Sequence, residues 1–326
     1  MILRPTRRAG LAAAAAAVFL PRTAWPQEPG RPYRIGVLSN FTREAPRWAA
    51  FFDELAKSGF AEGKNLIVDP RGFQFPVDQA AGLVEQLVQS GVDAILCAGK
   101  PMSALVQTAT RTIPILSVTD DMLVEGLIHS LAHPGGNLTG ISIFSSELNG
   151  KRQEILLDLL PEAHHIAALF DPGTAVPFQL ESLRKAGATR GVELSTYPAA
   201  KPEEVASAID NLSAQGATAL KVLASPLVDR YRRLLIERSA ARRLPAIYQS
   251  PETVEEGGLI AYGAPFSQIY RQLARQLVKV LRGTQPADLP VEQPTRFELV
   301  VNLKTAAALA LTVPPSILAR ADEVIE

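Results

Sequence analysis

Histidine and acidic side chains recur at a spacing that would suit a metal ion. Glu125, His129 and His133 are four residues apart, and a helix would place them along one face. The alternative is a solvated helix face near a C-terminus, where histidine suits the helix dipole. His164 and His165 are neighbours at the start of an expected strand, so they point to opposite sides and do not share an ion. We expect no metal site.

Asp120 and Asp121 form a carboxylate pair, a combination that some enzymes use as acid and base. Such a pair more often caps a helix and shapes a turn, and Asp120 can then also contact a ligand. No Gly-x-Ser-x-Gly elbow and no Gly-x-Gly-x-x-Gly turn follows an expected strand. The segment Gly99 to Ser103 lacks the glycine-rich turn of a phosphate loop, and Pro101 removes an N–H that such a loop needs. The sequence predicts a protein that is not an enzyme and uses no cofactor.

Short apolar runs alternate with helical patterns, which is the rhythm of βαβ units around a parallel sheet. In a first series we expect strands at 33–38, 66–69, 94–97, 113–118 and 139–143, with helices that include 102–110 and a short one at 124–131. In a second series we expect strands at 165–170, 192–197, 219–223 and 246–248, with helices at 148–160, 176–188, 202–214 and 228–242.

This order predicts an α/β fold with two doubly wound parallel-sheet lobes and a ligand cleft between them. Strand 259–262 and helix 266–282 form a further unit that we expect to cross back to the first lobe, and strand 297–302 is expected to return to the second. The expected division is a leader at 1–27, a first lobe at 32–145 plus 258–290, and a second lobe at 146–257 plus 291–326. The short passage 143–146 indicates a hinge.

Ligands of open parallel sheets bind beyond the carboxyl ends of the strands, so the residues there are candidate ligand-binding residues. They are Ser39, Asn40, Gly99, Lys100, Thr119, Asp120, Asp171, Ser225, Gln249 and Tyr262. Lys100 is either a cation for an anionic ligand or a solvated surface charge. Tyr248 and Tyr262 either stack on a planar ligand or lie half-buried in the core.

The charge balance argues against nucleic acid as a partner. The chain has 33 basic and 33 acidic side chains, and beyond its first residues no basic stretch is longer than Arg230–Arg233. Cys97 is the only cysteine and lies in an apolar run. We expect it to be a buried core thiol, the alternative being a reactive or intermolecular one.

The N-terminal segment 1–27 has the pattern of a secretory leader. A basic start is followed by an apolar run from Ala9 to Leu20 and a polar break before Gln27. The run is shorter than the roughly 20 residues that span a bilayer, so we expect cleavage and a periplasmic product. Thr6 to Leu11 also looks like a twin-arginine signal, which leaves the export route open.

Several segments, in a fixed order, resemble one family. They are Arg34–Ser39, Gly63–Leu66, Pro134–Gly140, Gly150–Arg152, Leu244–Tyr248, Gly257–Gly263 and, most specifically, Asp288–Glu326. Over essentially its whole mature length the chain resembles the ABC-transporter substrate-binding proteins of the group that includes tryptophan- and tyrosine-binding members. The resemblance implies a periplasmic protein of the type I binding fold, with three crossings between the lobes, that delivers a small molecule to a permease and its ATPase. We expect it to act as a monomer.

The resemblance also implies a set of cleft residues. The family's cleft positions correspond here to Ser39, Asn40, Gly99 to Ser103, Asp120, Asp171, Ser225, Tyr248 and Tyr262. Gly99–Ser103, Thr119–Asp121 and Asp171 depart from the family's usual residues, so an aromatic amino acid is not carried over as the ligand. The expected function is capture of a small polar, aromatic-acid or amino-acid-like ligand by lobe closure. The alternatives are a ligand-sensing module for a membrane receptor and an exported doubly wound enzyme.

Overall fold

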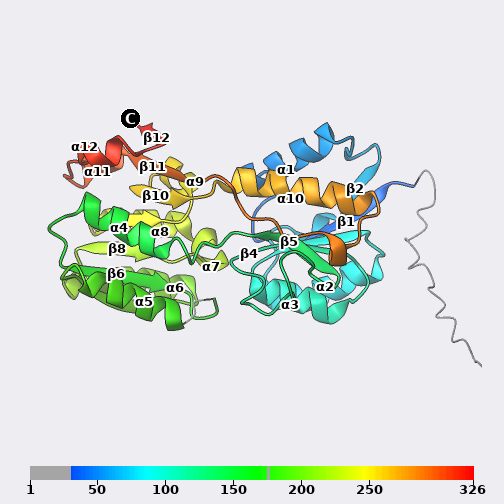
Figure 1. Ribbon diagram of the computed structural model, residues 1–326, viewed down its shortest axis with the longest axis horizontal. Helices are drawn as coiled ribbons and strands as arrows, with labels where there is room; N and C mark the ends of the chain where they lie inside the picture. Colours follow the sequence, from blue (N-terminus) through cyan, green and yellow to red (C-terminus); the bar gives the residue numbers. More distant parts are fainter. Residues whose placement is uncertain (1–30, 175–176) are drawn as a thin grey trace, which may run out of the picture. The chain divides into compact units, whose positions relative to one another are not determined.

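Two separate β-sheets organise the described part of the computed structural model, which covers residues 31–174 and 177–326 (Figure 1). One sheet has five parallel strands in the order β2-β1-β3-β4-β5. The other has seven strands in the order β12-β11-β10-β9-β8-β6-β7, and only the β10–β11 pair among them is antiparallel. The expected two-lobed α/β fold is thereby confirmed. The expected leader at 1–27 lies outside the described residues.

The first lobe is the five-stranded sheet with helices on both faces. Its strands are β1 (Tyr33–Val37), β2 (Leu66–Val68), β3 (Ala94–Ala98), β4 (Ile115–Thr119) and β5 (Leu138–Ser142). Its helices are α1 (Pro46–Lys57), α2 (Ala80–Gln89), α3 (Lys100–Ala109) and α10 (Phe266–Leu281), with 3-10 turns η1 (Pro70–Gly72), η2 (Val77–Gln79) and η3 (Pro286–Asp288).

Alternation along the strands explains these layers. Neighbouring strand residues point to opposite faces, so Ile95 of β3 packs in the cluster with α2 and α3, whereas Leu96 packs in the cluster with α1 and α10. Helices α1 and α10, far apart in the sequence, lie side by side on that second face (Figure 1). Burial on both faces accounts for strands that are almost continuously apolar.

The second lobe is the seven-stranded sheet with its own helices. Its strands are β6 (His165–Phe170), β7 (Glu193–Pro198), β8 (Ala219–Val222), β9 (Ala246–Tyr248), β10 (Ile260–Gly263), β11 (Glu298–Asn302) and β12 (Glu323–Ile325). Its helices are α4 (Asn149–Leu159), α5 (Pro177–Ala188), α6 (Pro202–Ala214), α7 (Pro226–Arg230), α8 (Arg232–Ala241), α9 (Pro251–Glu255), α11 (Leu303–Ala308) and α12 (Pro315–Leu318).

The structure differs from the expected elements in several places. Strand β10 lies in the second sheet between β9 and β11, so of the expected strand–helix unit helix α10 alone crosses back to the first lobe. The helix expected at 228–242 is broken into α7 and α8 at Tyr231. The strand β12 and the short helices α9 and α12 were not anticipated, because runs of three to five residues carry little periodic signal.

The helix expected at 124–131 is a series of turns. Asp121 Oδ1 accepts hydrogen bonds from the backbone N–H groups of Leu123 and Val124, and Gly126 takes a left-handed φ of 75°. An Asx turn of this kind competes with helix formation. Without a helix here, Glu125, His129 and His133 do not share a helix face, so the spacing that suggested a metal site does not bring them together.

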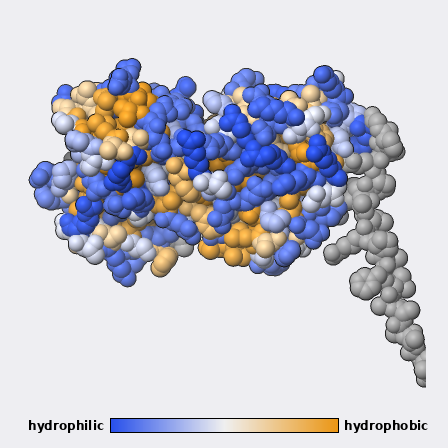
Figure 2. Space-filling view, turned by 45° about the horizontal axis from the view of Figure 1, so that its top comes forward, coloured by the Kyte–Doolittle hydropathy of each residue, from blue (hydrophilic) through white to orange (hydrophobic). Residues whose placement is uncertain are grey.

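The face of the molecule that Figure 2 shows is mainly hydrophilic, with smaller apolar patches between the hydrophilic residues. The large apolar side chains exposed among the described residues are Ile67, Leu123, Val124, Phe178 and Val324. No helix within the described ranges combines the length and the apolar character needed to cross a membrane.

Candidate functional site

A cleft lies between the two lobes and encloses about 1100 Å³, including open solvent at its mouth. Strand-end segments of both sheets line it, as expected for parallel sheets. The sequence-predicted residues that line it are Ser39, Asn40, Gly99, Lys100, Thr119, Asp120, Asp171, Ser225 and Gln249. Their gathering in one cavity agrees with the position expected for a ligand site.

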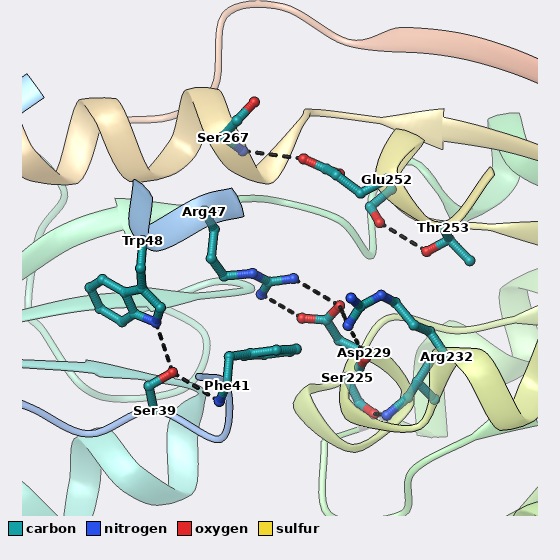
Figure 3. Close-up of polar contacts among 12 residues, drawn as sticks. Ser39, Phe41, Arg47, Trp48, Ser225, Asp229, Arg232, Glu252, Thr253 and Ser267 are labelled. Carbon is teal, nitrogen blue, oxygen red and sulfur yellow. Dashed lines mark hydrogen bonds and ion pairs between the residues drawn. The ribbon is translucent and has the colours of Figure 1, made fainter. Parts of the chain in front are cut away.

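Two short networks hold strand-end residues of the cleft wall. Ser39 Oγ accepts hydrogen bonds from the Trp48 indole Nε1 at 2.9 Å and from the Phe41 backbone N at 3.1 Å (Figure 3). In the other lobe, Ser225 Oγ accepts from the Val228 backbone N at 3.0 Å and so caps α7. The two serine side chains therefore hold the backbone in place where the chain leaves the strand in each lobe, and so help to shape the cleft wall.

An ion pair joins the lobes across the cleft. Arg47 on α1 donates from Nη1 to Asp229 Oδ2 at 2.6 Å and from Nη2 to Asp229 Oδ1 at 3.0 Å (Figure 3). Both residues are only 7% exposed. The guanidinium carbon also lies 3.9 Å from the centre of the Phe41 ring and 4.1 Å from that of Phe266. Burial acts to lower the pKa of Arg47, but the charge of Asp229, its hydrogen bonds, and the charges of Tyr270 and Glu252 together outweigh burial and raise the pKa.

Asp120 and Asp171 each hold a backbone turn at the cleft. Asp120 Oδ1 accepts from the backbone N of Ser146, in the first passage between the lobes, at 3.1 Å. Asp171 Oδ1 accepts from the backbone N of Gly173 at 2.8 Å. Each carboxylate thus fixes the backbone while its side chain also lines the cleft.

Glu125 is a cleft residue that the sequence indicated only as part of a metal site. Burial raises its pKa to about 7, repulsion by Asp120 adds to the rise, and the nearby Thr119 hydroxyl and Lys100 ammonium oppose it. Its Oε2 atom is buried and has no hydrogen-bond partner among the described residues. Nor does that part of the chain contain a group of three or more His, Cys, Asp and Glu side chains arranged for a metal.

Ser103, Tyr248 and Tyr262 do not line the cleft; the two tyrosines have the core position that was the alternative to stacking on a ligand. Ser103 Oγ is buried, donates to the Gly99 carbonyl at 2.8 Å and lies 2.6 Å from Ser117 Oγ. Tyr248 is packed in the second-lobe core, where burial raises its pKa to about 12. Tyr262 packs beside Phe297, against the core on the opposite face of the second-lobe sheet. For Tyr248 the reason is strand parity, since its side chain faces a helix layer while Gln249 reaches the cleft.

Cys97 is also buried, and its Sγ atom lies 3.6 Å from Ser103 Oγ. Burial raises the pKa of its thiol to about 11, so the thiolate is strongly disfavoured near neutral pH. Cys97 is therefore a buried core thiol, as expected from the sequence.

The residues missed by sequence reasoning are Arg47, Asp229 and Phe41. Arg47 carried a usable signal, because it precedes Trp48 on the apolar side of an amphipathic helix, where a charged residue needs a partner. No sequence pattern pairs it with Asp229, which is 182 positions away.

We expect Glu125→Gln to change how stability depends on pH. With a pKa of about 7 instead of 4.5, folded Glu125 keeps a proton that the unfolded chain releases, so the free energy of unfolding falls as pH rises from 4.5 to about 7. The loss is about 1–2 kcal/mol after allowance for partial solvent exposure. Thermal melts should therefore show similar stability of variant and wild type near pH 4.5, and a variant about 2–4 °C more stable at pH 8. Parallel curves at all pH values would contradict this assignment.

Comparison with known proteins agrees with the fold. A family model described as ABC transporter substrate binding protein matches residues 47–325. The tyrosine-binding protein of Clostridioides difficile strain R20291 is 24% identical over 261 residues, which are 79% of this chain and 75% of that protein.

Solved structures share the same two-lobed fold. A conserved domain protein from Vibrio cholerae has 26% identity and a TM-score of 0.80, covering 90% of this chain and 99% of that one. The ABC domain in complex with L-Trp from Streptococcus pneumoniae has 24% identity and a TM-score of 0.81, covering 90% and 100%. The match to the family model spans most of the chain. This protein therefore belongs to the ABC transporter substrate-binding protein family.

Proposed function

We propose that this protein captures a small molecule in the cleft and hands it to an ABC importer, without catalysing a reaction. The observation that carries the proposal is a single cavity lined by strand-end residues of both lobes and bridged by Arg47 and Asp229. Short passages between two rigid lobes permit hinge closure around a ligand. The partners in this proposal are a permease and its ATPase, and the protein itself acts as a monomer.

The proposed ligand is a small polar, aromatic-acid or amino-acid-like molecule. Two relatives support this class, since one is named a tyrosine-binding protein and another was solved in complex with L-Trp. The lining here also combines polar strand ends with apolar side chains such as Leu38, Phe75 and Met102. The proposed ligand-binding residues are Ser39, Asn40, Gly99, Lys100, Thr119, Asp120, Asp171 and Ser225.

We further propose export to the periplasm with loss of the leader. The support is the charge and apolar pattern of residues 1–27. Intact-mass analysis of the periplasmic fraction should find a mature start between Trp25 and Arg31. A full-length, membrane-extracted product would overturn the proposal.

A thermal-shift screen of amino acids, aromatic acids and amines tests the binding function. A ligand that binds only the folded state stabilises it by RT ln(1 + [L]/Kd), about 2.7 kcal/mol at a hundred times Kd. Small-angle scattering with the strongest stabiliser should then show a smaller radius of gyration than without it. A compound that stabilises the protein and leaves the scattering unchanged would contradict closure.

A further inference from the structure

Charged side chains that line the cleft are not balanced. Arg47 and Asp229 neutralise each other in their two-bond ion pair. Of the remaining charged residues in the described lining, one is the cation Lys100 and three are the carboxylates Asp120, Glu125 and Asp171. At pH 8, above the Glu125 pKa of about 7, the cleft therefore carries an excess of negative charge, and low-dielectric walls concentrate the field of such an excess on a ligand.

Lys100 does not offset this excess as an independent anion receptor. Burial raises the pKa of Glu125, and Lys100 is close enough to oppose that rise, so its charge already acts on a carboxylate. Lys100 is also exposed at the start of α3, where water competes for its ammonium group. The anionic ligand group expected opposite Lys100 would meet the carboxylates as well.

Two buried polar atoms on the same side of the cleft are unsatisfied within the described structure. Thr119 is 3% exposed and lines the cleft, yet its Oγ1 atom has no hydrogen-bond partner there. The Oε2 atom of Glu125 also has no partner within hydrogen-bonding distance there. The Thr119 hydroxyl lies near enough to the Glu125 carboxyl to lower its pKa, so the two groups face one region of the cleft. Native proteins rarely leave such atoms unpaired, and a ligand group that donates hydrogen bonds would satisfy both.

The donor must match what these atoms accept. Ionised carboxylates accept hydrogen bonds only, and a threonine hydroxyl accepts as well as donates. A protonated amine offers up to three N–H donors and a positive charge, whereas a ligand carboxylate offers neither. Thr119, Asp120 and Glu125, which we call the acidic corner, therefore suit an ammonium group.

We propose that the acidic corner binds the protonated amine of the ligand, and that the cleft selects small organic amines of net positive charge over zwitterions and anions. The inference rests on the proposed function, because it specifies the ligand of the same cleft. The apolar side chains Leu38, Phe75 and Met102 of the first lobe would contact the carbon skeleton of such an amine.

Matched compound series test this selection by calorimetry on the full-length protein at pH 8. One series is tryptamine, L-tryptophan and indole-3-propionate, and the other is tyramine, L-tyrosine and 4-hydroxyphenylpropionate. Within each series the apolar body is constant and the charge changes from positive to zero to negative. We expect each amine to bind at least about tenfold more tightly than its acid, with the amino acid between them.

Two variants assign the preference to the acidic corner. Glu125→Gln should weaken amine binding by about tenfold and leave the affinity for the acid unchanged or improved. Glu85→Gln is the matched control, since Glu85 is exposed on α2 in the same lobe, and its affinities should equal those of wild type. Thr119→Val, which removes only the hydroxyl at nearly constant volume, should also weaken amine binding and serves if the first variant folds poorly.

The outcomes separate this inference from the proposed function. Acids that bind as tightly as amines would overturn the amine selection while leaving a working binding protein. If no compound of either series binds, the ligand found on the protein by native mass spectrometry decides the inference: a net positive molecule supports it, and a neutral or anionic one overturns it. A protein that binds no small molecule at all loses the proposed function and the inference together.

Discussion

Arg47→Ala is expected to favour the open cleft and to weaken ligand binding by about a hundredfold to several thousandfold. With the lobes in contact, the variant leaves the Asp229 carboxylate buried without its partner, which costs about 3–5 kcal/mol. In the open form water solvates the same carboxylate, so the cost falls on the closed form. Because apparent affinity scales with the fraction of closed protein, the lost closure appears as lost binding.

Calorimetry and small-angle scattering on the same samples measure this effect. The variant should show a larger radius of gyration than wild type at equal ligand concentration. Arg275→Ala is a matched control, because Arg275 forms a 2.9 Å ion pair with Glu54 on the exposed surface of one lobe. Such a surface pair contributes about 0–1 kcal/mol, so the control should bind normally. Unchanged affinity and dimensions for Arg47→Ala would refute the bridging role of the pair.

Arg152→Met is expected to lower the free energy of unfolding by about 2–4 kcal/mol and the melting temperature by about 5–10 °C. Arg152 on α4 is 1% exposed. Its Nε donates to the Tyr262 carbonyl at 2.7 Å and its Nη1 donates to the Ser145 carbonyl at 2.7 Å. The Ser145 carbonyl belongs to the first passage between the lobes, and the Tyr262 carbonyl belongs to strand β10, just before the chain crosses to α10, so the variant leaves buried acceptors unpaired at both places.

The expected loss of stability in Arg152→Met is limited because burying the arginine cation is itself unfavourable. Burial lowers the pKa of Arg152 to about 10, which shows that the charge itself is disfavoured there. A neutral side chain recovers part of that cost and offsets part of the lost hydrogen bonding. Chemical denaturation checks the result, with Arg190→Met as the control because Arg190 is exposed and forms a surface ion pair with Asp158. Equal stability of the two variants would contradict the role of Arg152 at the hinge.

The sequence predicted the layers of the fold because they follow from local patterns. Alternation at Ile95 and Leu96 and the apolar stripe of α1 depend on neighbours within a few residues, and each places its element correctly. The segment at 124–131 has apolar residues at helical spacing but folds as turns, because Asp121 and Gly126 favour a competing local structure. Strand β10 was misplaced because strand partners are chosen by tertiary pairing, which periodicity does not report.

From the sequence, the only site residues that could be predicted were those whose position follows from the end of a strand. Lys100 and Asp120 line the cleft because the carboxyl ends of parallel strands share one edge. Tyr248 was misplaced by one position, since strand parity turns its ring into the core and sends Gln249 to the cleft. The Arg47–Asp229 bridge required the relative position of two lobes, and no pattern within either lobe contains that information.

The central claim, that this cleft holds a small molecule between closed lobes, is tested most directly by native mass spectrometry. Wild type and Arg47→Ala would be purified in parallel from the same cells without denaturation. We predict that wild type carries the added mass of one small molecule and that the variant carries it at much lower occupancy. Bare protein in both samples, or the same molecule at equal occupancy in both, would contradict the claim.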